Sequence, residues 1–497
     1  MMDSAAPYQF GSSAEDRTVL LGLRGRQLGL LAGGLVLAVL IVRSSPSGSA
    51  FLLAAAAVGC ASALAFWPIG GRTIDEWAPT ALRWATIRLL RRERWTSPAP
   101  VLGQTATGEP HECPPPVLDG VHILAAPVES DGRTAGIVHD RKAGTYAAIL
   151  AVRGRSFQLA DAPEKQRRLA TWGGVLAGLA RASSAVHRIQ WVERTVPEDG
   201  DAMGRYLSEA VRVPRDHATL ESYLELVDGA GPAASRHEAL LVVAISAGRA
   251  RRAIRQAGGG DDGAARVLLR EVVNLQRRLS SAEVTVDGIL GPRMVAAAIR
   301  TAFDPSARQH LARRAAAARD DGGTAPGNAW PLTTQTTWSA YRTADVWHAT
   351  YWIAQWPRTP VGADFLAPLL LGTQGLRSVS LVMEPVSTLR AHREVEHAVL
   401  KGMSDEELRS QAGFASTARR RRAQETAARR EHELADGHAD YRLAGYITVT
   451  ARSPDELEAR CGEIEQSAQQ SFLEIRRLDG DQDLAFACTL PLARGLR

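Results

Sequence analysis

Two apolar segments near the N-terminus constrain the fold of this chain more than any other feature. The first is Leu28 to Val42 and the second is Ala50 to Trp67, and neither contains a charged residue. A helix needs about 20 apolar residues to cross the hydrocarbon core of a bilayer, within a range of about 17 to 25. The second segment is long enough by itself, whereas the first is short unless Leu20 to Gln27 extends it. Because only Arg43 to Ser49 separates the two, we expect an antiparallel helical hairpin in a membrane.

The placement of arginines predicts the orientation of this hairpin. Arginines precede the first segment and follow the second, whereas the connecting loop holds only Arg43. Basic residues close to a span favour the cytoplasmic side, so we expect a multi-pass protein of the inner (cytoplasmic) membrane with both termini in the cytoplasm. Three alternatives stay open: a cleaved signal peptide, a hairpin buried inside a soluble protein, and partial insertion from the cytoplasmic face.

The stretch after the second segment combines tryptophans with arginines. Trp77 and Trp84 are seven residues apart and fall on one face of a helix. Indole rings at the level of the headgroups and guanidinium groups near lipid phosphates are typical of an interfacial helix. The residues predicted to anchor the chain at the membrane interface are Trp67, Trp77, Trp84, Arg91 and Arg92. The open alternative is an amphipathic helix that packs on the following domain.

The net positive charge of the chain is weak evidence for nucleic-acid binding. The formal net charge is +5, and only Lys142, Lys165 and Lys401 are lysines. The other basic residues are arginines in a chain rich in alanine and glycine, a bias that high-GC coding produces. The four cysteines show neither C-x-x-C spacing nor a disulfide framework, which fits a reducing cytoplasm.

The three lysines exclude a P-loop. None of them lies in G-x-x-x-x-G-K-[ST], in which the lysine reaches the β- and γ-phosphates of a nucleotide. The G-x-S-x-G, S-x-x-K and H-E-x-x-H motifs are also missing from the sequence. We therefore predict no catalytic residues and no cofactor, and expect that the protein is not an enzyme.

Two histidine-containing stretches are the only candidates for metal binding. In HREVEH, His392 and Glu396 share a helical face, whereas His397 lies about 100° further round. In EHELADGH, which ends at His438, two histidines are six residues apart. A solvated helix surface explains both stretches better than a three-ligand site, so we predict no metal.

Four consecutive arginines lie within a long charged helix predicted from about Ser387 to Ala435. They are Arg419, Arg420, Arg421 and Arg422. Consecutive residues wrap around a helix, so these side chains form a charged collar and not a single face. Three interpretations stay open: a solvated helix, contact with an acidic partner or anionic lipid, and contact with nucleic acid.

Behind the hairpin, the alternation of apolar patterns predicts an α+β fold. The strand–helix–strand pattern that begins with EALLVVAIS recurs in the unit that begins with AGYITVTA. Each unit follows a further strand and helix, as in split βαβ sandwiches. We therefore predict a two-helix transmembrane hairpin followed by two ferredoxin-like cytoplasmic domains.

The boundaries of these parts follow from proline- and glycine-rich breaks. The predicted parts are a disordered tail (1–19), the hairpin with the interfacial helix (20–96), a proline-rich linker (97–120), a first domain (121–303), a linker (304–330) and a second domain with the long charged helix (331–497).

Several segments carry a family resemblance. WPRTPVGADFLAPLLLGT, GYITVTARSPDELEARCGEIEQSAQQSFLEIRRL and LAFACTLPLARGLR resemble an actinobacterial membrane-protein family found in conjugation-type (type IV-like) secretion clusters. The hairpin with GRTIDEWAPTALRW resembles the small PrgI-type membrane component, and the rest is similar to the non-ATPase part of the conjugative-transfer ATPase. The resemblance implies a separately encoded P-loop secretion ATPase as a partner, and it implies no catalytic residues.

These observations support one main hypothesis and two alternatives. The main hypothesis is a non-enzymatic inner-membrane subunit of a conjugative or type IV-like machine, which docks the ATPase, other membrane subunits and further copies of itself. The first alternative is a membrane-anchored factor that binds DNA through the arginine collar. The second is a membrane component of type VII secretion, which also pairs N-terminal spans with a cytoplasmic α/β region.

Overall fold

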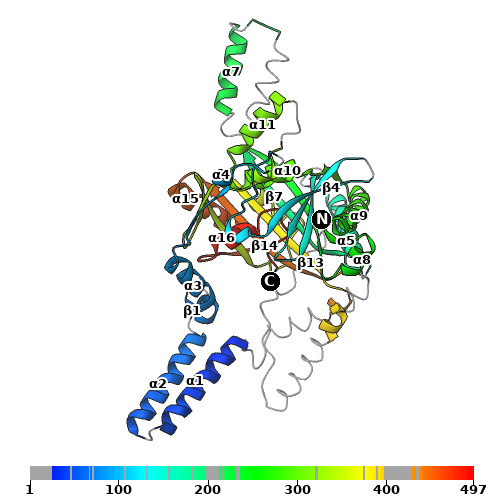
Figure 1. Cartoon of the computed structure of the whole chain (residues 1–497). Coiled ribbons are helices and arrows are strands. Elements are labelled where there is room, and N and C mark those ends of the chain that lie inside the picture. Colours follow the sequence, from blue (N-terminus) through cyan, green and yellow to red (C-terminus); the bar gives the residue numbers. More distant parts are fainter. Residues whose placement is uncertain are drawn as a thin grey trace, which may run out of the picture.

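The structure is a computed structural model of the whole chain (Figure 1). The residues that it describes are 25–44, 47–66, 68–69, 72–105, 108–129, 132–154, 157, 159–181, 183–197, 212–214, 217–230, 235–318, 323–372, 375–387, 390–396, 428, 430–432, 437 and 439–496. The predicted disordered tail, Trp67 and the four consecutive arginines at 419–422 lie outside the described residues, as does most of the predicted long charged helix.

One large antiparallel sheet forms the centre of the molecule (Figure 1). Its strands are β3 (Arg94–Thr96), β4 (Val121–Pro127), β5 (Thr134–Asp140), β6 (Thr145–Gly154), β7 (Val186–Pro197), β8 (Ser235–Ser246), β9 (Val284–Ile289), β10 (Thr333–Thr336), β11 (Tyr341–Thr343), β12 (Val346–Gln355), β13 (Leu376–Pro385), β14 (Tyr441–Ala451) and β15 (Glu474–Arg477). Their order is β3-β10-β11-β12-β14-β13-β7-β8-β6-β5-β4, with β9 also beside β6 and β15 also beside β12. The sequence predicted a fold that mixes helices with an antiparallel sheet, and the structure confirms this general class.

Helices surround the sheet and extend from it (Figure 1). They are α1 (Gly25–Ser44), α2 (Gly48–Phe66), α3 (Ile74–Leu89), α4 (Ala99–Leu102), α5 (Ala162–Leu179), α7 (Ala218–Ala230), α8 (Arg251–Gln256), α9 (Gly260–Ser281), α10 (Pro292–Phe303), α11 (Ala307–Ala318), α12 (Ala367–Leu371), α15 (Pro454–Gln470) and α16 (Gln482–Ala487), with the 3₁₀ turns η2 (Pro116–Leu118) and η4 (Pro326–Ala329). A small two-stranded ribbon, β1 (Pro68–Ile69) and β2 (Arg72–Thr73), connects α2 to α3.

The same strand order occurs twice in the sheet. In the first half it is β9-β6-β8-β7, and in the second half it is β15-β12-β14-β13. The last strands in these two orders, β7 and β13, pair with each other from Ile189↔Met383 to Arg194↔Ser378. The halves therefore share one continuous sheet, although the sequence predicted two domains in succession.

The middle of β8 is a continuous apolar run because both faces of the sheet are covered there. Along β8, Leu241, Val243 and Ile245 face a core that also contains α9 residues. Leu240 and Val242 face the opposite core, to which α10 and α16 contribute. A strand that is buried on both faces needs apolar residues at successive positions, which explains the continuous run EALLVVAIS.

The second half buries a polar layer on one face. Ile447 and Val449 of β14 pack against α15. On the other face, the Thr448 hydroxyl bonds to the Thr350 and Thr489 hydroxyls at 2.7 and 2.8 Å. The hydrogen bonds satisfy these groups, so the C-terminal segment packs on this face without a large desolvation penalty.

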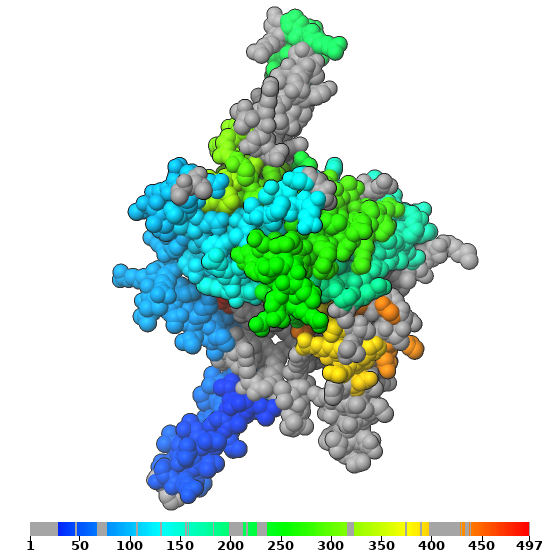
Figure 2. All heavy atoms as spheres, turned by 45° about the vertical axis from the view of Figure 1, so that its right-hand side comes forward, coloured from blue at the N-terminus to red at the C-terminus, as the bar shows by residue number. Residues whose placement is uncertain are grey.

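The helices α1 and α2 project from the body as an antiparallel pair (Figures 1 and 2). By length and composition, α2 is the one described helix that qualifies as a membrane span. The apolar part of α1, from Leu28 to Ser44, is shorter. The hairpin with two full spans therefore stays a prediction.

Two differences from the predicted organisation have a local cause. The helix α11 lies in the stretch predicted as a break, because ARQHLARRAAAA consists largely of strong helix formers. Short helices α4 and η2 lie in the proline-rich linker, where the first helical turn tolerates proline.

Candidate membrane anchor and its junction with the sheet

The outer surface of the α1/α2 pair is apolar and exposed. Large side chains with at least half of their surface exposed include Leu35, Val36, Leu37, Val39, Leu40, Phe51, Leu52 and Leu53. Contiguous apolar surface of this kind marks contact with a membrane or another protein. These exposed apolar side chains are therefore suited to contact with lipid chains or another apolar surface and not with water.

Small residues form the seam between the two helices. Gly34 of α1 faces Ala61 of α2 so closely that a Cβ atom at position 34 would lie 2.4 Å from the Ala61 Cβ. Further buried positions on the seam are Ala38, Ala50, Ala54 and Ala65. Close approach of backbones at glycine and alanine is the usual way in which membrane helices pack, because no hydrophobic effect drives their association there.

The helix α3 is fastened to the C-terminal part of the chain by charges. The Arg83 guanidinium donates to Asp481 at 2.9 Å and to Asp483 at 2.7 Å. The Thr80 hydroxyl also donates to Asp481, at 2.9 Å. Burial by itself would lower the pKa of Arg83, but the two carboxylates outweigh it and raise that pKa. The helix α3 is thus joined to the N-terminal end of α16, about 400 residues further along the chain.

The two predicted tryptophan anchors take part in the same junction. The Trp77 ring stacks on Trp338 with 5.7 Å between centroids, and the Trp84 ring meets Trp338 edge-on at 5.2 Å. Gly480 lies against Trp338, where a Cβ atom would come within 2.9 Å of the indole. These contacts agree with the open alternative, in which the helix packs on the following domain.

Two further predicted anchors, Arg91 and Arg92, lie outside this junction. Arg91 and Arg92 are exposed in the turn after α3, and Trp67 lies outside the described residues. An interfacial role for these five residues stays a prediction, as does the role of Arg419 to Arg422.

The described residues contain no group of three or more His, Cys, Asp and Glu side chains that could hold a metal ion. In the HREVEH stretch, Glu394 instead pairs with Arg390 at 3.1 Å and with Arg442 at 3.5 Å. His397 and His438 lie outside the described residues, so the two candidate stretches are described only in part.

The buried carboxylates of the sheet are held by arginines. Glu384 of β13 accepts from Arg249 at 2.7 Å and from Arg188 of β7 at 3.3 Å. Burial would raise the pKa of Glu238, but Arg194 and Arg308 outweigh it and lower that pKa to about 2. Because each carboxylate is already paired, these groups are suited to joining elements of the fold and not to acid–base chemistry.

The partners of α3 were not predicted from the sequence. Trp338 and the LDGDQD stretch, which contains Asp481 and Asp483, attracted no interpretation. The acidic run was a usable signal, because its carboxylates are natural partners for the arginines of an amphipathic helix. Its pairing with Arg83 in particular depends on the tertiary fold.

The comparisons with known proteins give one finding. The family model described as "Putative type VII ESX secretion system translocon, EccE" matches residues 233–353. The matched stretch runs from β8 through most of β12 and thus includes parts of both halves of the sheet. A comparison with curated proteins gave no match. The resemblance to PrgI-type and conjugative-transfer proteins receives no support from these findings.

Proposed function

We propose that the chain is a non-enzymatic membrane component of a type VII, ESX-like secretion translocon. The observation that carries this proposal is the match of residues 233–353 to the EccE family model. This function was one of the alternatives drawn from the sequence. It replaces the conjugative machine as the leading hypothesis because the match to the EccE model supports it, whereas the conjugative hypothesis has no support.

The α1/α2 pair supports a role in the membrane. Its exposed surface is apolar, its seam is built from glycine and alanine, and α2 is long enough to span. We propose that both helices cross the membrane, with α1 extended by the residues before Leu28, and that both ends of the chain lie in the cytoplasm.

The continuous sheet supports a docking role for the rest of the chain. We propose that β6 to β9 and β12 to β15 are two ferredoxin-like units, since each has the strand order of a split βαβ sandwich. The carboxylates of Glu238 and Glu384 are paired with arginines, which suits a scaffold. The partners proposed for it are a separately encoded P-loop secretion ATPase, other membrane subunits of the translocon and further copies of the chain.

A test is to express the tagged full-length chain in its native host, solubilise the membranes gently and separate the complexes by native electrophoresis. The expected result is co-migration with type VII subunits, including their ATPase, identified by mass spectrometry. The Arg83→Glu variant places a negative charge beside Asp481 and Asp483 and should loosen α3 from the rest of the chain. This variant should remain in the membrane but associate more weakly with the other subunits. Co-migration with conjugation proteins, or migration of the chain alone, would contradict the proposal.

A further inference from the structure

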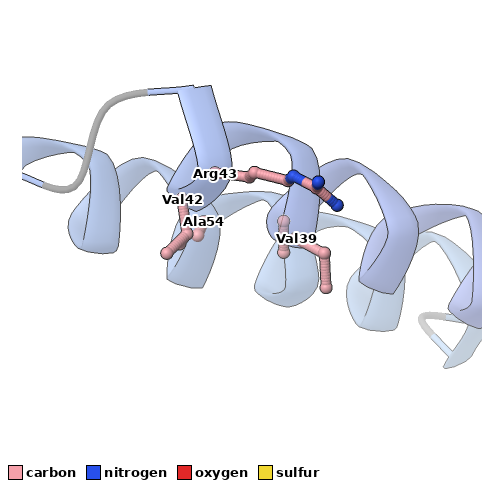
Figure 3. Close-up of a pocket in the computed structure, with 5 residues that line it drawn as sticks. Val39, Val42, Arg43 and Ala54 are labelled. Atoms are coloured by element: carbon pink, nitrogen blue, oxygen red, sulfur yellow. The ribbon is translucent and has the colours of Figure 1, made fainter.

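A groove lies between α1 and α2 near the loop that connects them. It has a volume of about 360 Å³ and is lined by Ala38, Val39, Val42, Arg43 and Ala54 (Figure 3). The groove is shallow and largely open to its surroundings. The side chains that line the groove are almost entirely apolar. Those of Ala38 and Ala54 are small and fill little of its volume.

Among the described residues that line the groove, Arg43 has the one polar side chain. Figure 3 shows its side chain lying along the helix pair, with Val42 and Ala54 near one end of the groove and Val39 further along. The side chain is exposed, so its guanidinium is accessible from outside the hairpin.

The hairpin cannot supply a carboxylate for Arg43. It is the only charged residue between Leu28 and Phe66, and the sequence has no acidic residue between Asp16 and Asp75. A cation at the edge of the hydrocarbon region is costly unless it reaches the interface or an anion. The anions that surround a membrane helix at this depth are lipid phosphates, which the planar guanidinium binds with two parallel hydrogen bonds.

The connecting loop and the start of α2 carry further polar groups. The hydroxyl oxygens of Ser47 and Ser49 lie 2.9 Å apart, and the Ser47 hydroxyl oxygen accepts from the backbone N–H of Ala50 in the first turn of α2. The surface thus changes from polar at the loop to apolar along the groove. A phospholipid has the same division between its headgroup and its acyl chains.

We propose that this groove binds one anionic phospholipid of the leaflet that the connecting loop faces. One acyl chain lies against Val39, Val42 and Ala54, and the phosphate is held by the Arg43 guanidinium. This inference rests on the proposed membrane role of the hairpin and adds a specific lipid contact to it.

The test uses the full-length chain in nanodiscs that contain phosphatidylglycerol and phosphatidylcholine. Native mass spectrometry after gentle release counts the lipids that stay bound. We expect the unmodified chain to retain phosphatidylglycerol in preference to phosphatidylcholine, and Arg43→Gln to reduce this preference about tenfold, as expected for the loss of a charge-assisted pair. Arg43→Lys should keep part of it.

Two further variants separate charge from shape. Val39→Phe fills the groove without changing the charge and should lower lipid retention. Arg141→Gln removes an exposed arginine from the turn between β5 and β6, far from the hairpin in the sequence, and should change nothing.

Carbonate extraction of the membranes, done first, separates this inference from the proposed function. Release of the unmodified chain by carbonate would overturn the membrane role and the lipid site together. A chain that stays in the membrane but retains equal amounts of both lipids, or whose preference survives Arg43→Gln, would overturn the lipid site alone. The same holds if Val39→Phe leaves lipid retention unchanged, because the lipid would then not occupy the groove.

Discussion

At the scale of single residues, burial decides the roles of the titratable groups, as His348 illustrates. Its ring is fully buried, with Nε2 2.8 Å from the Thr343 hydroxyl and Nδ1 2.9 Å from the Thr450 hydroxyl. Burial lowers the pKa of His348 to about 3, and the opposing effects of the Phe303 carbonyl and Asp304 are smaller. The ring is therefore neutral at physiological pH and acts as a structural hydrogen-bonding group.

This pKa predicts a loss of stability in mild acid. Below the pKa of an unfolded histidine, near 6.5, the unfolded chain takes up a proton that the native ring does not. The contribution of His348 is thus complete above about pH 6.5 and falls by about 1.4 kcal/mol per pH unit until about pH 3. Thermal unfolding of the full chain in detergent, compared at about pH 7.5 and about pH 5.5, measures the effect.

Two variants assign the acid effect to this residue. His348→Gln should flatten the dependence of the melting temperature on pH, because glutamine keeps a polar group without titrating in this range. His310→Gln, at an exposed position of α11, should leave the dependence unchanged. Equal slopes in the unmodified chain and His348→Gln would show that other groups cause the effect.

At the scale of elements, the helix pair α1/α2 depends on glycine at one position and not at its neighbour. Gly34 is buried on the seam against Ala61, whereas a Cβ atom at Gly33 would meet nothing within 4 Å. The two glycines are adjacent in the sequence and chemically identical, so the difference between them comes from the packing of the pair alone.

This difference predicts that Gly34→Val separates the helices and that Gly33→Val does not. Overpacking at position 34 should cost about 1–3 kcal/mol of helix association. Cysteines introduced at Ala38 and Ala54, which line the same groove, report the distance through a short bifunctional cross-linker, with the exposed Cys60 replaced by alanine. Similar cross-linking yields in Gly34→Val and Gly33→Val would contradict the close packing of Gly34 against Ala61.

At the scale of the whole molecule, the two halves are joined by the C-terminal segment as well as by the β7–β13 pairing. The side chain of Gln190 on β7 is fully buried. Its amide nitrogen donates to the Ser380 hydroxyl at 2.8 Å and to the Leu490 carbonyl at 2.9 Å, and its carbonyl accepts from the Ala493 N–H at 2.7 Å. One side chain therefore connects both halves and the end of the chain.

The shared sheet predicts one cooperative unfolding transition for residues 121–496. Gln190→Leu should lower the free energy of unfolding by about 2–4 kcal/mol, because it leaves buried partners without hydrogen bonds. Gln309→Leu, at an exposed position of α11, should change it by less than about 0.5 kcal/mol. Circular dichroism during heating measures both, and two well-separated transitions in the unmodified chain would contradict a single unit.

Local signals in the sequence were sufficient for many elements. The helix α15 spans Pro454–Gln470 because Ser453 caps its first turn and Pro454 suits its first position. The strands β4, β7 and β13 follow from their apolar patterns in the same way. In contrast, α10 received no prediction, although Pro292 suits its first turn and the apolar residues of PRMVAAAIRTAF recur with a helical period.

The sequence by itself thus determined the apolar hairpin, the missing P-loop and the repeated strand–helix–strand pattern, because all three depend on residue types at short spacing. Only the tertiary structure decided that the halves share one sheet, since β7 and β13 are nearly 200 residues apart and edge pairing leaves no mark in either strand. It also placed Trp77 and Trp84 on Trp338, although the same amphipathic pattern suits a lipid surface equally well. Spacing shows which face of a helix is apolar, and only the fold shows what that face contacts.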